Sequence, residues 1–342
     1  MARRGRTDVD IFIQQLINGA TLGSVYAIVA LGYTMVYGII QLINFAHGEV
    51  VMIGAMVAYT VIVALIGAGT PLPPLAIVLI GAMVAIPVCM AVGFTLERVA
   101  YRPLRRAPRL APLITAIGLS IILQHLAMII WSRNPLPYPQ IVNVVSYHVT
   151  GNPGGATITN VQIAIIAISV TMMAALTTLV YRTKLGIAMR AVAQNQPVAG
   201  LMGIDINRVI AVTFVIGAGL GAVAGVMVGT YYGVAHYQMG FLLGLKAFSA
   251  AVLGGIGNLA GAMVGGLLLG LIEALGAGYV GDLTNLCHLS SWFDALAKRC
   301  ETDPNVVLFG SNYQDVFAFL VLILVLVFRP SGLLGERVSD RA

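Results

Sequence analysis

The sequence predicts an all-α protein that crosses a membrane repeatedly, with about 8–10 transmembrane helices, some short or discontinuous. Of the 342 residues, 59% are hydrophobic and only 9% are charged, whereas a soluble domain carries about 25% charged residues. The mean hydropathy is +0.93, and apolar runs recur along the chain. The 39 glycines suit close contacts between membrane helices. This composition excludes a disordered or collagen-like chain.

The net charge of +6 does not indicate nucleic-acid binding, because the basic residues lie in short loops between apolar runs. Positive charge in such loops marks the cytoplasmic side of a membrane protein. Five arginines in residues 97–109 give the strongest such signal, and arginines near both termini give the same one. The first apolar run is too long for a cleaved signal peptide. We therefore predict a single membrane domain over residues 1–342 with both termini cytoplasmic.

The first apolar stretch, residues 11–43, is too long for one crossing of a bilayer. Its 33 residues would form a helix of about 50 Å, against a hydrocarbon core of about 30 Å. Two cytoplasmic segments must be separated by an even number of crossings, which favours dividing the stretch near Gly32. We predict a first span at residues 11–31, a short segment at 33–45 and a further span at 50–66.

A polar run at residues 42–49, LINFAHGE, interrupts this apolar region. Asn44, His47 and Glu49 prefer water to lipid, so the run is a cytoplasmic turn or a functional interruption inside the membrane. A histidine in such a place is more often structural than a ligand. Glu49 fits equally well as a site residue and as a carboxylate that stabilises the start of the next helix. The sequence leaves these alternatives open.

The rest of the chain alternates between apolar spans and loops. Further spans are expected at residues 75–96, 110–131, 161–181, 209–232 and 316–328. Residues 132–160 and 279–315 are predicted to be periplasmic loops, whereas the basic segment 182–208 is predicted to be cytoplasmic and helical.

The apolar region 241–278 is also overlong, and Gly257 and Asn258 break it in the middle. We expect two short crossings or a re-entrant pair here. Each half of the chain thus contains one interrupted apolar region, which is typical of a transport pathway built from discontinuous helices.

Glycines recur every four residues along the expected span 209–232, at Gly217, Gly221, Gly225 and Gly229. This spacing places them on one face of a helix, where they permit close contact with a neighbouring helix. A sliding interface and static packing both fit the pattern.

Polar residues at membrane depth are the candidates for a substrate pathway. His125 is one such ionisable residue, and Lys246 can instead extend its ammonium group to the membrane surface. The predicted pathway residues are Asn44, His47, Glu49, Lys246 and Glu273.

Cys287 and Cys300 lie in the same predicted periplasmic loop, whereas Cys89 lies inside a span. The pair is a candidate disulfide that would contribute about 3 kcal/mol, with two free thiols as the alternative. The sequence contains no phosphate-binding loop, zinc-protease motif or cysteine–histidine cluster. We therefore predict no catalytic residue, no metal site and no cofactor bound by this chain, so that any ATP is used by partner subunits.

Several motifs, in order, resemble those of the LivH-type permeases, membrane subunits of the bacterial ABC importers for branched-chain amino acids. The resemblance covers nearly the whole chain. Its motifs are residues 18–19 (NG), 26–34 (YAIVALGYT), 43–49 (INFAHGE), 190–193 (RAVA) through 203–204 (GI), 208–211 (RVIA), 246–257 (KAFSAAVLGGIG) and 329–335 (RPSGLLG).

This resemblance implies an inner-membrane permease subunit that carries no ATPase site of its own. It implies as partners a second, related permease, two cytoplasmic ATPases and a periplasmic amino-acid-binding protein. The residues expected to couple to an ATPase are Arg190, Ala191, Ala193, Gly200 and Gly203. The family also includes permeases for other amino acids, amides and urea, which leaves the substrate open. Residues 281–312 depart from the family by their greater length. An ion-driven transporter and a channel are the rival classes.

Overall fold

The computed structural model describes residues 2–42, 44–105, 107–108, 110–150, 155–283 and 313–335. Within these residues, seven helices are long and apolar enough to cross a membrane. They are α1 (Ala2–Ile40), α2 (His47–Gly67), α3 (Pro74–Leu96), α5 (Leu110–Ile130), α6 (Asn160–Arg182), α9 (Ile206–Tyr232) and α11 (Leu259–Leu283). Two shorter apolar helices are α10 (Met239–Gly254) and α13 (Gln314–Phe328). The predicted class, a helical protein that crosses a membrane repeatedly, is confirmed.

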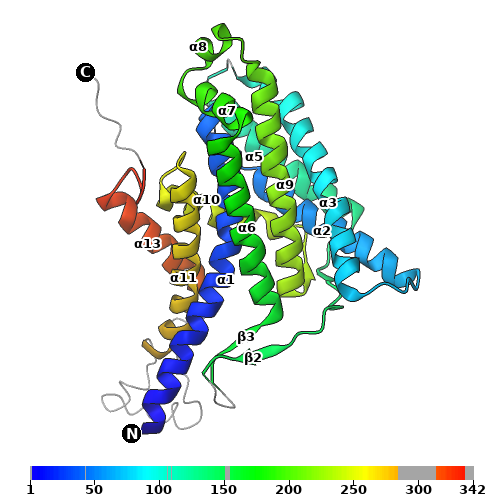
Figure 1. The fold of residues 1–342 in the computed structure, drawn as a ribbon, viewed down its shortest axis with the longest axis vertical. Coiled ribbons are helices and arrows are strands. Elements are labelled where there is room, and N and C mark those ends of the chain that lie inside the picture. The colour runs from blue at the N-terminus through cyan, green and yellow to red at the C-terminus, as the bar shows by residue number, and fades with distance from the viewer. Residues whose placement is uncertain are drawn as a thin grey trace.

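Short elements lie at the two ends of the helix bundle (Figure 1). One end, called the α8 end, carries η1 (Glu97–Tyr101), α4 (Arg102–Leu104), α7 (Lys184–Gln194) and α8 (Gln196–Leu201). The opposite end, called the hairpin end, carries two antiparallel pairs of strands. In one pair β1 (Leu136–Pro137) joins β4 (Val234–Ala235), and in the other β2 (Ser146–His148) joins β3 (Thr157–Thr159).

Helix α1 is continuous over 39 residues. The predicted division near Gly32, into segments 11–31 and 33–45, is therefore wrong. A Cβ atom at Gly32 would overlap the ring of His47, so this glycine admits a close contact and does not end the helix. At 1.5 Å per residue α1 is about 58 Å long, and its N-terminal part extends beyond the other helices (Figure 1).

The single passage of α1 places the two ends of the described chain at opposite ends of the bundle. The backbone N–H of Thr157, in β3, donates to Gln14 Oε1 at 2.8 Å, which fixes the beginning of α1 at the hairpin end. Residues 329–335 instead lie beside Tyr37 and Tyr181 at the α8 end. The prediction that both termini share the cytoplasmic side is wrong, because it depended on the extra crossing within residues 11–43.

Two breaks in the helical structure lie inside the bundle. The first break, residues 41–46, separates α1 from α2, and the second break, residues 233–238, separates α9 from α10. His47 at the start of α2 lies against Gly32, about 12 Å back from the end of α1. Gln41 has a φ of +53°, a left-handed value that is uncommon for a residue other than glycine. The LINFAHGE run is thus an interruption inside the bundle and not a surface turn.

The two halves of the chain form an inverted repeat around these breaks. Helix α1 packs on α11 as α9 packs on α3, and α2 packs on α3 and α9 as α10 packs on α11 and α1. Met239, which begins α10, lies 192 positions after His47, which begins α2, and Tyr232, which ends α9, lies 192 positions after Ile40, which ends α1, so the two breaks have equal length. Helices α2 and α10 leave the middle of the bundle toward opposite ends. The two halves correspond in how their helices pack, and no repeat is evident in the sequence.

The predicted break at Gly257 and Asn258 is confirmed, since α10 ends at Gly254 and α11 begins at Leu259. Gly257 has a φ of +98°, which favours glycine at this position. The tail after α13 covers this turn, and Leu333 N–H donates to the carbonyl oxygen of Leu253 at 2.9 Å.

Candidate functional site

Helices α2 and α10 cross in the middle of the bundle with their backbones in contact. A Cβ atom added at Gly48 would lie 2.9 Å from the Cα of Gly244 and would overlap the carbonyl oxygen of Gly240. Because real Cβ atoms do not approach other atoms so closely, only glycine permits this crossing. We call it the glycine crossing and define it by Gly48, Gly240 and Gly244. It is the point at which the two halves of the inverted repeat meet.

The carboxylate of Glu49 lies beside the glycine crossing and has no exposed surface. Its Oε1 atom accepts hydrogen bonds from Ser120 Oγ and Gln124 Nε2 of α5, each at 2.8 Å. Its Oε2 atom has no hydrogen-bond partner among the described residues and lies 2.8 Å from an ideal Cβ on Gly240. Glu49 therefore binds α5, and it also lies in the first turn of α2, where a carboxylate is favourable. One of its oxygens remains able to accept a hydrogen bond.

His47 and Asn44 hold the start of α2 in place. His47 is buried, with its ring 4.9 Å from the ring of Tyr33 in an edge-on arrangement. Asn44 is also buried, and its Oδ1 atom accepts a hydrogen bond from the hydroxyl of Tyr101 at 2.8 Å. These contacts fit a positioning role for both residues, next to the crossing.

Lys246 and Glu273 lie in a different cluster, between α1, α10, α11 and α13. Lys246 Nζ is 2.7 Å from Glu273 Oε1 and 2.7 Å from Asp315 Oδ1. The hydroxyl of Tyr26 donates to Glu273 Oε2 at 3.0 Å. Lys246 is therefore paired with carboxylates and does not extend to the membrane surface. The contacts of Lys246 and Glu273 described here do not include Asn44, His47 or Glu49, so the five predicted pathway residues lie in two clusters.

The glycine face of α9 packs against α1, α2 and the loop before α6. A Cβ atom at Gly225 would overlap the carbonyl oxygen of Val51. One at Gly229 would lie 2.6 Å from the ring of Tyr138. Gly217 and Gly221 both face the ring of His47, at 3.7 and 3.8 Å from their ideal Cβ positions. This face brings α9 close to the start of α2.

The segment expected to couple to an ATPase forms α7 and α8. The Cζ atom of Arg190 lies 5.4 Å from the centre of the Tyr181 ring. Ala191 and Ala193 pack against the buried cluster at the α8 end. Gly200 lies inside α8, and Gly203 has a φ of +83° in the turn that follows it.

The tip of α8 presents apolar side chains on the outside of the molecule. Leu201 is 87% exposed and Met202 is 79% exposed. An exposed apolar patch of this kind is typical of a contact with another protein or with the membrane. Figure 1 shows α8 at the extremity of this end of the bundle.

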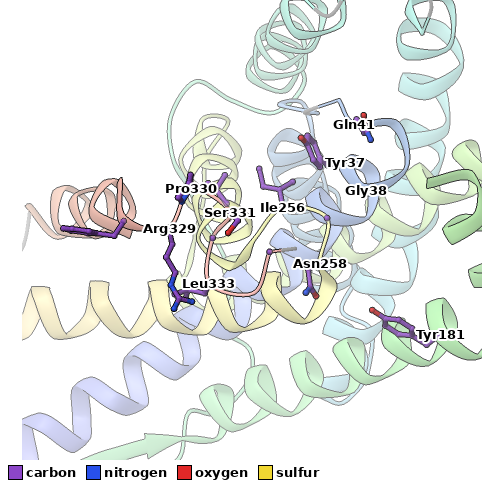
Figure 2. A pocket seen from close by; sticks show the side chains of 15 residues that line it. Tyr37, Gly38, Gln41, Tyr181, Ile256, Asn258, Arg329, Pro330, Ser331 and Leu333 are labelled. Atoms are coloured by element: carbon purple, nitrogen blue, oxygen red, sulfur yellow. The ribbon is translucent and has the colours of Figure 1, made fainter. Parts of the chain in front are cut away.

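A pocket of 1110 Å³ opens at the α8 end of the bundle. Figure 2 shows it between the end of α1, with Tyr37 and Gln41, the turn after α10, with Asn258, and the tail, with Arg329. Its volume is ample for a ligand of amino-acid size. Polar groups from three separate segments therefore surround a space on the α8 side of the glycine crossing.

Comparison with known proteins gives the family of this chain. Residues 15–326 match the family described as "Branched-chain amino acid transport system / permease component". The chain belongs to this permease family. The predicted resemblance is thereby confirmed, and the protein is a multi-pass membrane component of a transport system.

This permease has curated relatives along almost its whole length. It is 45% identical over 325 residues to the high-affinity branched-chain amino acid transport system permease protein BraD of Pseudomonas aeruginosa, covering 95% of this chain and 96% of that protein. It is 44% identical over 327 residues to the corresponding permease protein LivH of Escherichia coli K12, with the same coverage. No solved structure gives a significant match.

The sequence did not reveal the partners of the permease's polar residues. Ser120 and Gln124 carry a usable signal, since they lie four residues apart in a largely apolar helix and therefore share a face. Tyr101 and Tyr26 carry none, because tyrosines are common near membrane surfaces. Cys89 is buried, whereas Cys287 and Cys300, with their candidate disulfide, lie outside the described residues.

Proposed function

We propose that this permease is the membrane subunit of an ATP-driven importer of branched-chain or closely related amino acids in the bacterial inner membrane. The observation that carries the proposal is its 44–45% identity, over 95% of the chain, to BraD and LivH. In this proposal, a periplasmic binding protein delivers the amino acid, and a second, related permease completes the path. Two separate ATPase subunits use the ATP, and this chain binds no cofactor.

The glycine crossing offers suitable chemistry for an amino acid. An amino acid carries an ammonium group and a carboxylate, and Glu49 Oε2 is a free acceptor for the first of these. Helices α2 and α10 both begin at the crossing, and the start of a helix favours a negative group. When α2 and α10 separate, a zwitterion between them can thus be bound at both of its charges.

The exposed tip of α8 supports docking of an ATPase at the α8 end, which makes this end cytoplasmic and the hairpin end periplasmic. The pocket beside Asn258 then serves as the exit toward the cytoplasm. Movement of α7 and α8 by the ATPases would favour one of two states of the permease. Such a shift requires that the ATPases bind the two states with different affinity.

Transport by the reconstituted complex tests this function. The permease, its partner permease and its ATPases are placed in proteoliposomes with the binding protein, and uptake of radiolabelled leucine, isoleucine and valine is measured. We expect uptake only with ATP. Uptake that continues without the ATPases and stops with an uncoupler would indicate an ion-driven transporter, and uptake that needs no energy source would indicate a channel.

A matched pair of variants tests the docking site in the same assay. Leu201→Asp places a charge on the exposed tip of α8, and we expect loss of ATPase copurification and of ATP-driven uptake. Leu72→Asp places the same charge in the loop between α2 and α3 at the hairpin end, where Leu72 is 39% exposed. We expect this control to keep its ATPases, and equal copurification of both variants would contradict docking at α8.

A further inference from the structure

The element η1 is a π-helical turn between α3 and α4. Such turns are rare and occur frequently at functional sites. Glu97 and Tyr101, its first and last residues, are each only 1% exposed, whereas Val99 between them is 70% exposed. Two polar side chains of one short turn therefore point into the protein, and each makes a specific contact.

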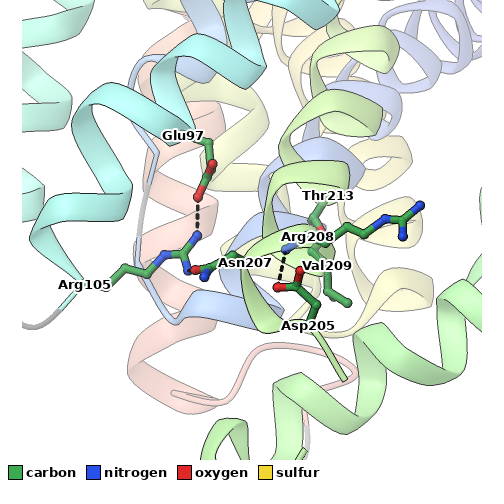
Figure 3. A network of polar contacts seen from close by, with 7 residues as sticks. All are labelled: Glu97, Arg105, Asp205, Asn207, Arg208, Val209 and Thr213. Carbon is green, nitrogen blue, oxygen red and sulfur yellow. Dashed lines mark hydrogen bonds and ion pairs between the residues drawn. The ribbon is translucent and has the colours of Figure 1, made fainter. Parts of the chain in front are cut away.

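The first contact joins η1 to the segment that follows α8. Glu97 forms an ion pair with Arg105, and Arg105 Nη1 donates to Asn207 Oδ1 at 2.8 Å. Asn207 lies in the first turn of α9, whose start is capped by Asp205 through the backbone N–H of Arg208 at 3.2 Å (Figure 3). Burial lowers the pKa of the Arg105 guanidinium, and the Glu97 carboxylate opposes this shift. The base of α9 is thereby tied to η1.

The second contact joins η1 to the first break. The hydroxyl of Tyr101 donates to Asn44 Oδ1 at 2.8 Å, and both side chains are buried. The Asn44 carbonyl oxygen accepts a hydrogen bond from the backbone N–H of His47 at 3.0 Å. Asn44 therefore begins the turn that leads into α2. The ring of Tyr101 lies 5.2 Å from that of Phe214 in α9. A shift of α9 relative to η1 therefore acts on Tyr101, the donor of the Tyr101–Asn44 bond.

The segment α7–α8 also touches the other side of the same break. Gln196 Nε2, at the start of α8, donates to the carbonyl oxygen of Ile39 at 3.1 Å. The last turn of α1 is therefore held directly, and the start of α2 is held through η1. The second break is held from the hairpin end, by the pairing of β1 with β4 and by the bond from Tyr138 N–H to Gly233 O at 2.9 Å. Of the two breaks, only the first is reached by the contacts of α7–α8 described above.

We propose that Tyr101 is the positioning residue that couples movement of the α7–α8 segment to movement of the first break. Its hydroxyl transmits the position of η1 to Asn44, and Asn44 sets the start of α2 at the glycine crossing. The inference deepens the proposed function and rests on it, because coupling has meaning only if separate ATPases act on α7 and α8.

The variant Tyr101→Phe removes this one hydroxyl and keeps the aromatic ring. In the reconstituted full complex we expect ATPase subunits to remain bound, with hydrolysis within about twofold of the wild-type rate. We expect leucine uptake per ATP hydrolysed to fall at least about tenfold, as for the loss of a buried hydrogen bond of about 1.4 kcal/mol. Tyr59→Phe removes the same hydroxyl from the outer half of α2 and should leave this ratio unchanged.

Asn44→Ala removes the acceptor from the opposite side and gives the same readout if Tyr101→Phe fails to assemble. If the bond is the link, the double variant should be no worse than either single variant. A wild-type ratio in both single variants, or effects that multiply in the double variant, would overturn the inference. Failure of the wild-type complex to show ATP-driven uptake would instead overturn the proposed function.

Discussion

Glu49 and Glu273 are two buried glutamates in the same membrane domain, and their surroundings differ. Glu273 is 1% exposed and receives a proton donor at each oxygen, Lys246 at 2.7 Å and Tyr26 at 3.0 Å. Glu49 has no exposed surface and accepts two neutral donors at Oε1, and its Oε2 has no partner in the part of the chain that the structure describes. Both residues are buried glutamates, but among the described residues only Glu273 is paired with a cation.

We propose that this difference separates a structural carboxylate, Glu273, from one that binds the substrate, Glu49. A buried charge is costly unless a partner neutralises it, and Glu273 has such a partner. Among the described residues only Ser120 and Gln124 donate to the carboxyl group of Glu49, which leaves Oε2 without a donor. A site that is incomplete without a ligand can bind one, whereas a completed ion pair holds helices together.

We expect the largest effect from Lys246→Met, which removes the cation beside Glu273. The variant leaves Glu273 and Asp315 without their cation, and removal of one partner of a buried pair costs about 3–5 kcal/mol. We expect a large fall in the unfolding temperature of the purified permease in detergent. Lys184→Met, which removes an exposed lysine from the start of α7, is the control and should leave the unfolding temperature unchanged. A stable Lys246→Met variant would show that the cluster does not hold the fold.

Glu49→Gln tests the carboxyl group that has no cation beside it. The amide keeps an acceptor for Ser120 and Gln124 but loses the charge, so we expect the free energy of unfolding to change by less than about 1 kcal/mol. Loss of a charge-assisted hydrogen bond to the substrate costs about 1.5–3 kcal/mol, which predicts a fall in leucine uptake of about tenfold or more.

Glu273→Gln is the matched variant for Glu49→Gln. It should show the opposite pattern, with lower stability and, at a temperature where the variant is folded, near-normal uptake. A loss of uptake in Glu273→Gln equal to that in Glu49→Gln, in folded protein, would contradict the division of roles.

Asp315→Asn should have the smallest effect. The Asp315 side chain is 38% exposed, so water already screens its ion pair with Lys246. We expect a loss of less than about 1 kcal/mol in the free energy of unfolding, measured by denaturant titration in detergent. A loss as large as that of Lys246→Met would mean that Asp315, rather than Glu273, is the principal partner of the lysine.

The helices and their interruptions could be predicted from the sequence because both depend on local composition. Apolar runs give spans, and polar or glycine-rich interruptions give the breaks near Asn44 and Asn258. The division of residues 11–43 near Gly32 was wrong, because a glycine that ends a helix cannot be distinguished in sequence from one that makes room for a neighbouring side chain. Only the position of His47 in space tells them apart. The error then placed the N-terminus on the same side as residues 329–335, whereas the beginning of α1 lies at the opposite end of the bundle.

The candidate site could be predicted in part, again for physical reasons. Asn44, His47 and Glu49 stand out because polar groups are costly in an apolar region. Their partners cannot be inferred locally, since Ser120 and Gln124 follow Glu49 by 71 and 75 positions. Lys246 and Glu273 were assigned to the same pathway because the sequence shows that they lie within apolar spans. It does not show which helices are in contact. That pairing is a property of packing.

Helix α1 has a consequence for how the two surfaces of the membrane communicate. Near one end Gln14 holds Thr157 of β3, and near the other the carbonyl oxygen of Ile39 holds Gln196 of α8. Gln14 and Ile39 are 25 positions apart in one uninterrupted helix, a strut of about 38 Å. Because such a strut barely changes its length, an axial displacement at the α8 end reaches the hairpin end undiminished. In the proposed function these two ends face the ATPases and the incoming amino acid. We therefore expect arrival and release of the amino acid to be timed by the same helix.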